Sequence, residues 1–307
     1  RAFVNKQSPF SGDFRLAGKA RKSILRNMKF PKILMLLSAA ALLSALPACK
    51  KSDPLEKPEG FVAAWNFADG LSSTCGKFTP TAFGNVKTVN DGPLSGKSLE
   101  LDGKSYLSIP YAQTGALNVK SGEVTVVAWV KWSGEGIGFV GGMWNEYKDG
   151  GKRQYGLFVS LPYYNGGDNV CGHISKTGKP TPPFPYSIDY SASGQKVPHG
   201  KWVCAAFTYD GKYIRSYLNG EFAERAPELI DHTKGFEGYP DGITHSKNPY
   251  YFPDGIGDNG SDFTIGSVLL KSGMGNFFKG RIGGLAVYNR ALTDAELRDL
   301  AAAYPLE

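Results

Sequence analysis

Residues 277–300 constrain the fold of this 307-residue chain more than any other stretch. Apolar side chains alternate with small or polar ones over residues 282–288, which is the two-residue period of a β-strand. Asn289 and Arg290 then turn the chain, and residues 293–296 form a Thr-x-x-Glu capping box, the signature of a helix start. The pattern predicts a strand that ends in one short helix.

Strand patterns recur upstream. Residues 124–132 alternate with apolar side chains on both faces, which predicts a central strand. The apolar run 201–209 is followed by Asp-Gly at 210–211, then by 213–218, then by Asn-Gly at 219–220. Both dipeptides favour tight hairpin turns. Three antiparallel strands in sequence are therefore expected.

Several of these motifs resemble those of laminin-G-like, concanavalin A-like domains. The matching segments are 65–67, 99–103, 124–131, 202–211, 217–221 and 280–293. The resemblance implies an all-β fold, a two-sheet antiparallel jelly-roll sandwich with one short C-terminal helix, over residues 61–304. Long insertions separate the matched strands.

The N-terminal region predicts a secreted, anchored protein. A basic segment at residues 28–32 precedes an apolar run at 33–46, which is typical of a signal peptide. Leu46-Pro47-Ala48-Cys49 resembles a bacterial lipobox, so residues 28–48 are interpreted as a lipoprotein signal peptide and Cys49 as the lipidated residue. The alternative is an ordinary signal peptide beside an incidental cysteine. Residues 1–27 are interpreted as an upstream non-native segment.

Residues 49–60, with prolines and charges, are expected to form a flexible tether between lipid and fold. No second linker follows, so residues 61–304 are expected to form one domain. The predicted location is the cell envelope, anchored to the outer membrane on its periplasmic or surface side, and the lipid is the expected contact with the membrane.

Charge argues against nucleic acid as a partner. The net charge of +7 comes from residues 1–48, which hold nine Lys or Arg and one Asp. The remaining residues carry 26 basic and 27 acidic side chains. A body without excess positive charge lacks the electrostatic footprint of a nucleic-acid-binding protein.

Three cysteines follow Cys49, at positions 75, 171 and 204. Cys171 and Cys204 each lie in a strand-like run, so a disulfide between them is one prediction. A pair with Cys75 and three free thiols are the alternatives.

Two insertions and one strand end carry the candidate ligand-binding residues. Ordered aromatic rings beside acids or amides suit sugars, because rings stack on C–H faces and hydroxyls need hydrogen-bond partners. The candidates are Trp144, Asn145, His173, Tyr186, Asp189, Tyr190, Tyr250 and Tyr251. The alternatives are a proline-rich crossover packed on a sheet edge and, for Trp144, an ordinary core aromatic.

Residues 235–262 also contain oxygen-bearing side chains between glycines. Such groups suit Ca²⁺, which takes about six to eight oxygen ligands in adaptable geometry. The candidate metal ligands are Asp254, Asp258, Asn259 and Asp262. A set of solvated turns is the alternative interpretation.

Three functions follow as hypotheses. The favoured one is a lipid-anchored, non-catalytic protein that binds a polysaccharide or another glycan. The second is a glycoside hydrolase or polysaccharide lyase in which His173 acts with Asp189 or Tyr190. The Glu-x-Asp-x-x-Glu string of glycosidases with this fold does not occur in the sequence. The third is a protein-interaction or scaffold module.

Overall fold

A computed structural model describes residues 53–146, 151–162, 166–179, 190–226, 228–230, 243–245 and 247–306; of 228–230 and 243–245 it describes the backbone. Cys49, Tyr186 and Asp189 lie outside these ranges, as do the predicted signal peptide and the segment before it. Within the described ranges, no helix has the length and apolar character needed to cross a membrane.

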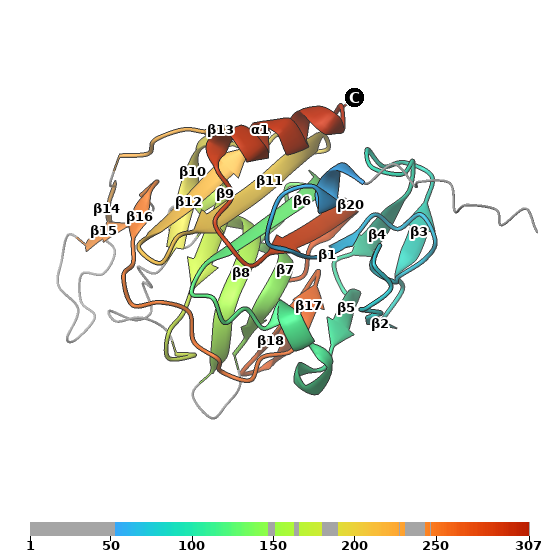
Figure 1. Cartoon of the computed structure of the whole chain (residues 1–307), viewed down its shortest axis with the longest axis horizontal. Helices are drawn as coiled ribbons and strands as arrows, with labels where there is room; N and C mark the ends of the chain where they lie inside the picture. The colour runs from blue at the N-terminus through green and yellow to red at the C-terminus, as the bar shows by residue number, and fades with distance from the viewer. Residues whose placement is uncertain are drawn as a thin grey trace, which may run out of the picture. The chain divides into compact units, whose positions relative to one another are not determined.

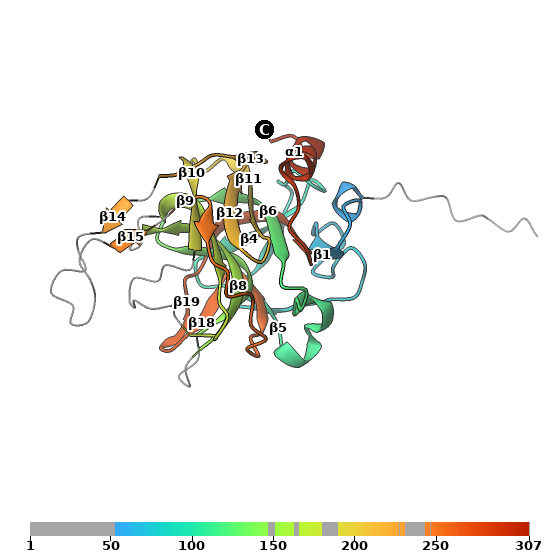
Figure 2. The ribbon, with the colours of Figure 1, turned by 60° about the vertical axis from the view of Figure 1, so that its left-hand side comes forward.

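The body is built on two large antiparallel sheets, and the views in Figures 1 and 2 show both. In the described residues the larger sheet has nine strands. Its path is β13 (Glu221–Phe222), β12 (Tyr213–Leu218), β11 (Trp202–Tyr209), β6 (Val124–Trp132), β20 (Lys279–Tyr288), β4 (Ser98–Asp102) and β3 (Lys87–Val89), with β1 (Phe61–Trp65) on β20 and β16 (Tyr250–Tyr251) on β12.

The second sheet has seven strands in the described residues. Its order is β10 (Tyr190–Lys196), β9 (Gly166–Ile174), β8 (Lys152–Leu161), β7 (Gly138–Asn145), β17 (Phe263–Ile265), β5 (Tyr106–Ile109) and β2 (Thr81–Phe83). Smaller elements are the hairpins β14 (Glu228–Ile230) with β15 (Ile243–His245) and β18 (Val268–Leu270) with β19 (Gly273–Gly275), and the 3₁₀ turns η1 (Pro54–Glu56), η2 (Tyr111–Gln113) and η3 (Gly115–Leu117).

The predicted jelly-roll sandwich is confirmed. β6 is a central strand between β11 and β20, and β11, β12 and β13 pair in sequence order as expected. Alternate side chains of the two sheets meet in one apolar core, because successive residues of a strand point to opposite faces. Gly172 allows close packing there, since a Cβ at this position would lie 2.5 Å from Phe207.

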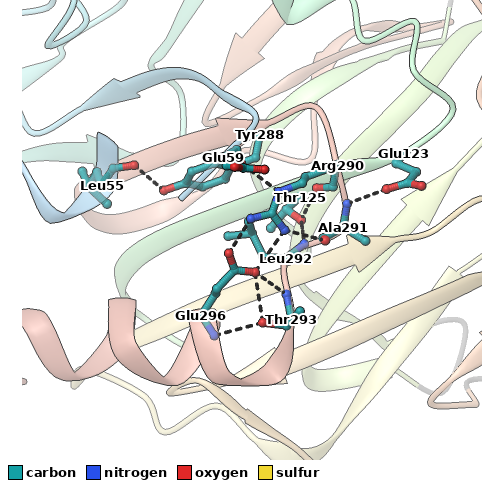
Figure 3. Close-up of polar contacts among 10 residues, drawn as sticks. All are labelled: Leu55, Glu59, Glu123, Thr125, Tyr288, Arg290, Ala291, Leu292, Thr293 and Glu296. Atoms are coloured by element: carbon teal, nitrogen blue, oxygen red, sulfur yellow. Dashed lines mark hydrogen bonds and ion pairs between the residues drawn. The ribbon is translucent and has the colours of Figure 1, made fainter. Parts of the chain in front are cut away.

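Part of the outer face of the nine-stranded sheet is covered by α1 (Asp294–Ala303), the predicted C-terminal helix (Figure 1). Its capping box is confirmed: Thr293 Oγ1 accepts from the Glu296 backbone N–H at 3.3 Å, and the Glu296 carboxylate accepts from the Thr293 N–H at 2.9 Å. Arg290 holds the corner by pairing with Glu296 and donating to the Glu59 carbonyl at 2.9 Å (Figure 3).

Residues 53–60, which the sequence assigns to the tether, lie on the folded body. Leu55 is fully buried beneath α1, and its carbonyl accepts a hydrogen bond from the Tyr288 hydroxyl at 2.7 Å (Figure 3). Tyr304 donates to the Asp53 carboxylate. Tyr288 and Tyr304, near the C-terminal end of the chain, therefore fix Asp53 and Leu55 on the body.

The predicted disulfide between Cys171 and Cys204 is not formed, and Cys75, Cys171 and Cys204 are free thiols. Cys204 packs under α1 on the outside of the nine-stranded sheet. Cys171 packs with Tyr190 and Phe158 on the outside of the seven-stranded sheet. The two side chains point away from each other across the sandwich, which prevents a bond.

Candidate functional site

The seven-stranded sheet brings together three of the predicted ligand-binding residues. Trp144 on β7, His173 on β9 and Tyr190 on β10 share its outer face. The ring centroids of Trp144 and His173 are 4.6 Å apart, and His173 stacks on Tyr190 at 4.9 Å with an interplanar angle of 3°. All three are buried, with exposed fractions of 2%, 6% and 0%.

Polar groups next to these rings in the chain or in space serve the fold. The Asn145 side chain accepts from the Leu269 N–H at 2.9 Å, which holds β18 against β7. The Arg153 guanidinium lies 5.6 Å from the Trp144 ring and pairs with Glu146 at 2.6 Å. Burial, and then the Arg153 charge, lower the pKa of His173 well below its ordinary value, so its imidazole is neutral at physiological pH.

Three of the predicted metal ligands, Asp258, Asn259 and Asp262, are hydrogen-bonded to other parts of the protein. Asp258 Oδ1 accepts from the Tyr111 hydroxyl and the Asn118 amide, each at 2.8 Å. These bonds, in that order, and then the nearby Lys120 charge lower the pKa of Asp258 against the opposing effect of burial. Asp262 Oδ1 accepts from the Tyr111 N–H at 2.8 Å, and the Asn259 amide donates to the Arg153 carbonyl at 2.6 Å.

Across the part of the chain that the structure describes, no three His, Cys, Asp or Glu side chains lie close enough to share a metal ion. Asp254 and Asp258 are in the same loop as predicted, but the groups that Asp258 contacts are donors rather than other oxygen ligands. Calcium binding stays a prediction.

Tyr250 and Tyr251 are separated by the sheet. β16 pairs with β12 so that Tyr250 faces Ile214 and Tyr251 faces Tyr213. Tyr250 points into the core and is 8% exposed, whereas Tyr251 is 58% exposed on the outer face. Of the described ligand-binding candidates, Tyr251 is the one with an exposed ring.

Tyr213 completes an exposed aromatic pair that the sequence interpretation missed. Its ring centroid lies 5.3 Å from that of Tyr251, with an interplanar angle of 56°. The signal was available in the sequence, because Tyr213, Arg215 and Tyr217 alternate along β12 and therefore share its outer face.

Charged groups continue from this pair along the sheet. The Arg215 guanidinium lies 5.2 Å from the Tyr213 ring, and its NH1 donates to Asp210 Oδ2 at 2.6 Å. The other oxygen, Asp210 Oδ1, accepts from the N–H groups of Lys212 and Tyr213 at 2.9 and 2.7 Å. Partial burial acts to raise the pKa of Asp210, but these hydrogen bonds outweigh it and lower the pKa.

An open groove of about 540 Å³ lies where β11 and β12 meet the start of α1. Its polar lining comes from Thr208, Asp210, Arg215, Tyr217, Thr293 and Asp294. The Tyr217 hydroxyl donates to Asp294 Oδ1 at 2.9 Å, which fixes that carboxylate. Arg215 belongs to both the groove and the aromatic pair, so the two features form one surface, here called the β12 surface.

Another groove, of about 570 Å³, lies between η1 and α1. Its lining includes Pro54, Lys57, Pro58, Leu300 and Ala303 and contains no aromatic ring among the described residues. It therefore lacks the stacking group that a sugar requires.

Comparison with known proteins supports the fold. Residues 102–240 match the family model of the concanavalin A-like lectin/glucanases superfamily, so the resemblance of the motifs is confirmed. The structure is similar to domain 4 of a GH43 extracellular arabinanase from Geobacillus stearothermophilus in complex with arabinotriose. The TM-score is 0.51 at 21% identity, over 78% of this chain and 98% of that one.

The structure is also similar to the CBM40 of the IT-sialidase from Ruminococcus gnavus bound to α2,3-sialyllactose. The TM-score is 0.44 at 16% identity, over 68% of this chain and 96% of that one. No curated protein sequence matches this chain.

Proposed function

We propose, on the premise of a concanavalin A-like jelly roll, that this protein binds a glycan chain without cleaving it and is held in the bacterial cell envelope by a lipid on Cys49. The proposal has three parts: glycan binding, absence of catalysis and lipid anchoring. Each is supported by a different observation.

The exposed pair Tyr213 and Tyr251 carries the glycan-binding part. A sugar ring needs an accessible aromatic face and nearby donors and acceptors for its hydroxyls. The β12 surface has both, since the Arg215 and Asp210 side chains lie within reach of the pair. The arabinanase domain of similar fold holds arabinotriose, so this fold is compatible with binding a sugar chain, although a fold does not fix function.

The non-catalytic part is supported by the state of His173. A general base must reach the proton it removes. His173 is 6% exposed, between the rings of Trp144 and Tyr190, and burial lowers its pKa, which makes it a weak base. Asp189, its proposed partner in an enzyme, lies outside the described residues.

The anchoring part is supported by the lipobox-like residues 46–49 and by the position of Asp53. Three residues separate Cys49 from Asp53. At roughly 3.5 Å per residue, a fully extended chain of this length reaches about 14 Å. A lipid on Cys49 therefore holds the body close to the membrane, because Leu55 packs under α1 and Asp53 accepts a hydrogen bond from Tyr304.

A glycan array and polysaccharide pull-downs, with and without Ca²⁺, test glycan binding. We expect binding that is lost in the Tyr213→Ala/Tyr251→Ala double variant and that leaves the glycan chain length unchanged. Absence of binding under both conditions refutes the proposal, and shortened glycan products refute its non-catalytic part. Retention of Cys49→Ser in the membrane fraction contradicts the lipid anchor.

A further inference from the structure

We infer that the β12 surface selects uncharged glycan chains and disfavours acidic ones, an inference that rests on the glycan binding proposed above. The selectivity comes from the charges that line the groove beside Tyr213 and Tyr251. Tyr213 and Tyr251 carry the binding, whereas Asp210, Arg215 and Asp294 carry the selectivity.

The surface is long enough for a chain rather than a single sugar. Tyr213, Arg215 and Tyr217 lie at alternate positions of β12, so the distance from the first to the third is about 13 Å at roughly 3.3 Å per residue. Tyr251 extends the surface sideways onto β16, and Asp294 extends it onto α1. An extended glycan lying along β12 contacts the aromatic pair at one end and the groove at the other.

The groove offers both donors and acceptors to hydroxyl groups. Arg215 uses NH1 for Asp210, and within the described residues its remaining N–H donors carry no hydrogen bond. Asp294 accepts one bond from Tyr217, and a carboxylate has further lone pairs. A sugar hydroxyl can donate to Asp294 and accept from Arg215, so an uncharged ring satisfies both groups.

An acidic sugar meets a different balance of charge. The lining contains two carboxylates, Asp210 and Asp294, and one guanidinium, Arg215. Arg215 is already paired with Asp210, which leaves the Asp294 charge without a basic partner in the lining. Glu123 adds a further negative group nearby, because its carboxylate accepts from the N–H of the groove residue Ala291 at 3.1 Å. A uronate or sulfate placed here is repelled.

Three basic residues adjoin this surface outside the groove lining. Arg290 precedes the groove residue Ala291 and is paired with Glu296. Arg298 lies four residues after Asp294 on α1 and is exposed, so solvent and salt screen its charge. The third is Lys212. It follows the Asp210 turn, and its backbone N–H rather than its side chain contacts Asp210. It is exposed and outside the groove lining, so its charge is screened by water and salt. It does not offset Asp294.

Calorimetric titration of the purified protein tests the inference with two probe series of equal length, neutral arabino- or xylo-oligosaccharides and acidic oligogalacturonates. We expect the neutral series to bind at least tenfold more tightly at low salt. Asp294→Asn keeps an oxygen for the Tyr217 hydroxyl. It is expected to reduce the ratio of neutral to acidic affinity several-fold, because the acidic oligosaccharides then bind more tightly. Asp299→Asn makes the same charge change elsewhere on α1 and is expected to leave the ratio unchanged.

Two outcomes overturn the inference. One is equal or tighter binding of oligogalacturonate, and the other is an equal effect of Asp294→Asn and Asp299→Asn. If Tyr251→Ala still weakens binding in either case, glycan binding on this surface stands and only the selectivity fails. If no probe binds and the glycan array is also negative, the proposed function itself is refuted.

Discussion

Tyr213 and Tyr251 face each other across adjacent strands, with ring centroids 5.3 Å apart and one ring more than half exposed. Cross-strand partners of an antiparallel pair point to the same side of the sheet. Because their chain neighbours Ile214 and Tyr250 point into the core, the two rings are fixed on the outer face rather than free to turn inward. The pair is therefore a preformed aromatic surface.

Tyr251→Ala is expected to weaken glycan binding about three- to tenfold, the loss of one aromatic stacking interaction. Its melting temperature should change little, because the ring is exposed. Phe83→Ala is the matched control, since Phe83 is also exposed and stacks on Tyr106 at 4.8 Å on the other sheet. Loss of binding in Phe83→Ala but not in Tyr251→Ala would place the site on the seven-stranded sheet and contradict the proposed one.

Leu55→Ala is expected to lower the free energy of unfolding by about 2–4 kcal/mol, because the side chain is fully buried under α1. Lys57→Ala, in the same segment but exposed, should cost less than about 0.5 kcal/mol. Urea unfolding measures both. Equal, small effects would mean that residues 53–60 behave as a flexible tether in solution.

Thr293→Ala removes the hydroxyl that caps α1 and is expected to destabilise the protein by about 1 kcal/mol. Thr293→Ser keeps the hydroxyl and should remain close to wild type. Thermal or urea unfolding compares the two variants. A cost that is the same for both would show that the methyl group, not the cap, matters.

The pairing of Glu296 with Arg290 makes the free energy of unfolding depend on pH in the acid range. Hydrogen bonds from Arg290, and then from Thr293, lower the pKa of Glu296 from 4.5 to about 2 against the opposing effect of burial. A lowered folded-state pKa gives a stabilisation that is complete above the unfolded-state pKa and is lost as pH falls through the folded one. Glu296→Gln should therefore lose this pH dependence between about pH 4.5 and pH 2. Parallel stability profiles for both proteins would contradict this.

The three thiols of the body should differ in reactivity. Burial raises the pKa of both Cys171 and Cys204 to about 12, and both are fully enclosed, whereas Cys75 is partly exposed. A maleimide followed by mass spectrometry should label Cys75 in the native protein and the other two only after unfolding. A mass two hydrogens lower, without labelling of Cys171 and Cys204 after unfolding, would indicate a disulfide between them.

The strands themselves could be predicted because their patterns are local. Alternation at 124–132 and the turns at 210–211 and 219–220 determine which residues pair and where the chain reverses. The capping box at Thr293 likewise needs residues only three apart. The buried position of Leu55 could not be predicted, because its neighbours on α1 and β20 lie more than 200 residues away.

By itself the sequence determined the two-residue alternation, the hairpins, the helix start and the resemblance to concanavalin A-like domains, since each depends on residues close in the chain. Only the tertiary structure decided which candidates are accessible. Trp144 and Tyr190 are buried, and Tyr250 and Tyr251 lie on opposite faces of one sheet. Cys171 and Cys204 lie on the outer faces of different sheets. Pairing β12 with β16 placed Tyr251 beside Tyr213. Exposure depends on which elements cover a face, and that is set by contacts between residues far apart in the chain.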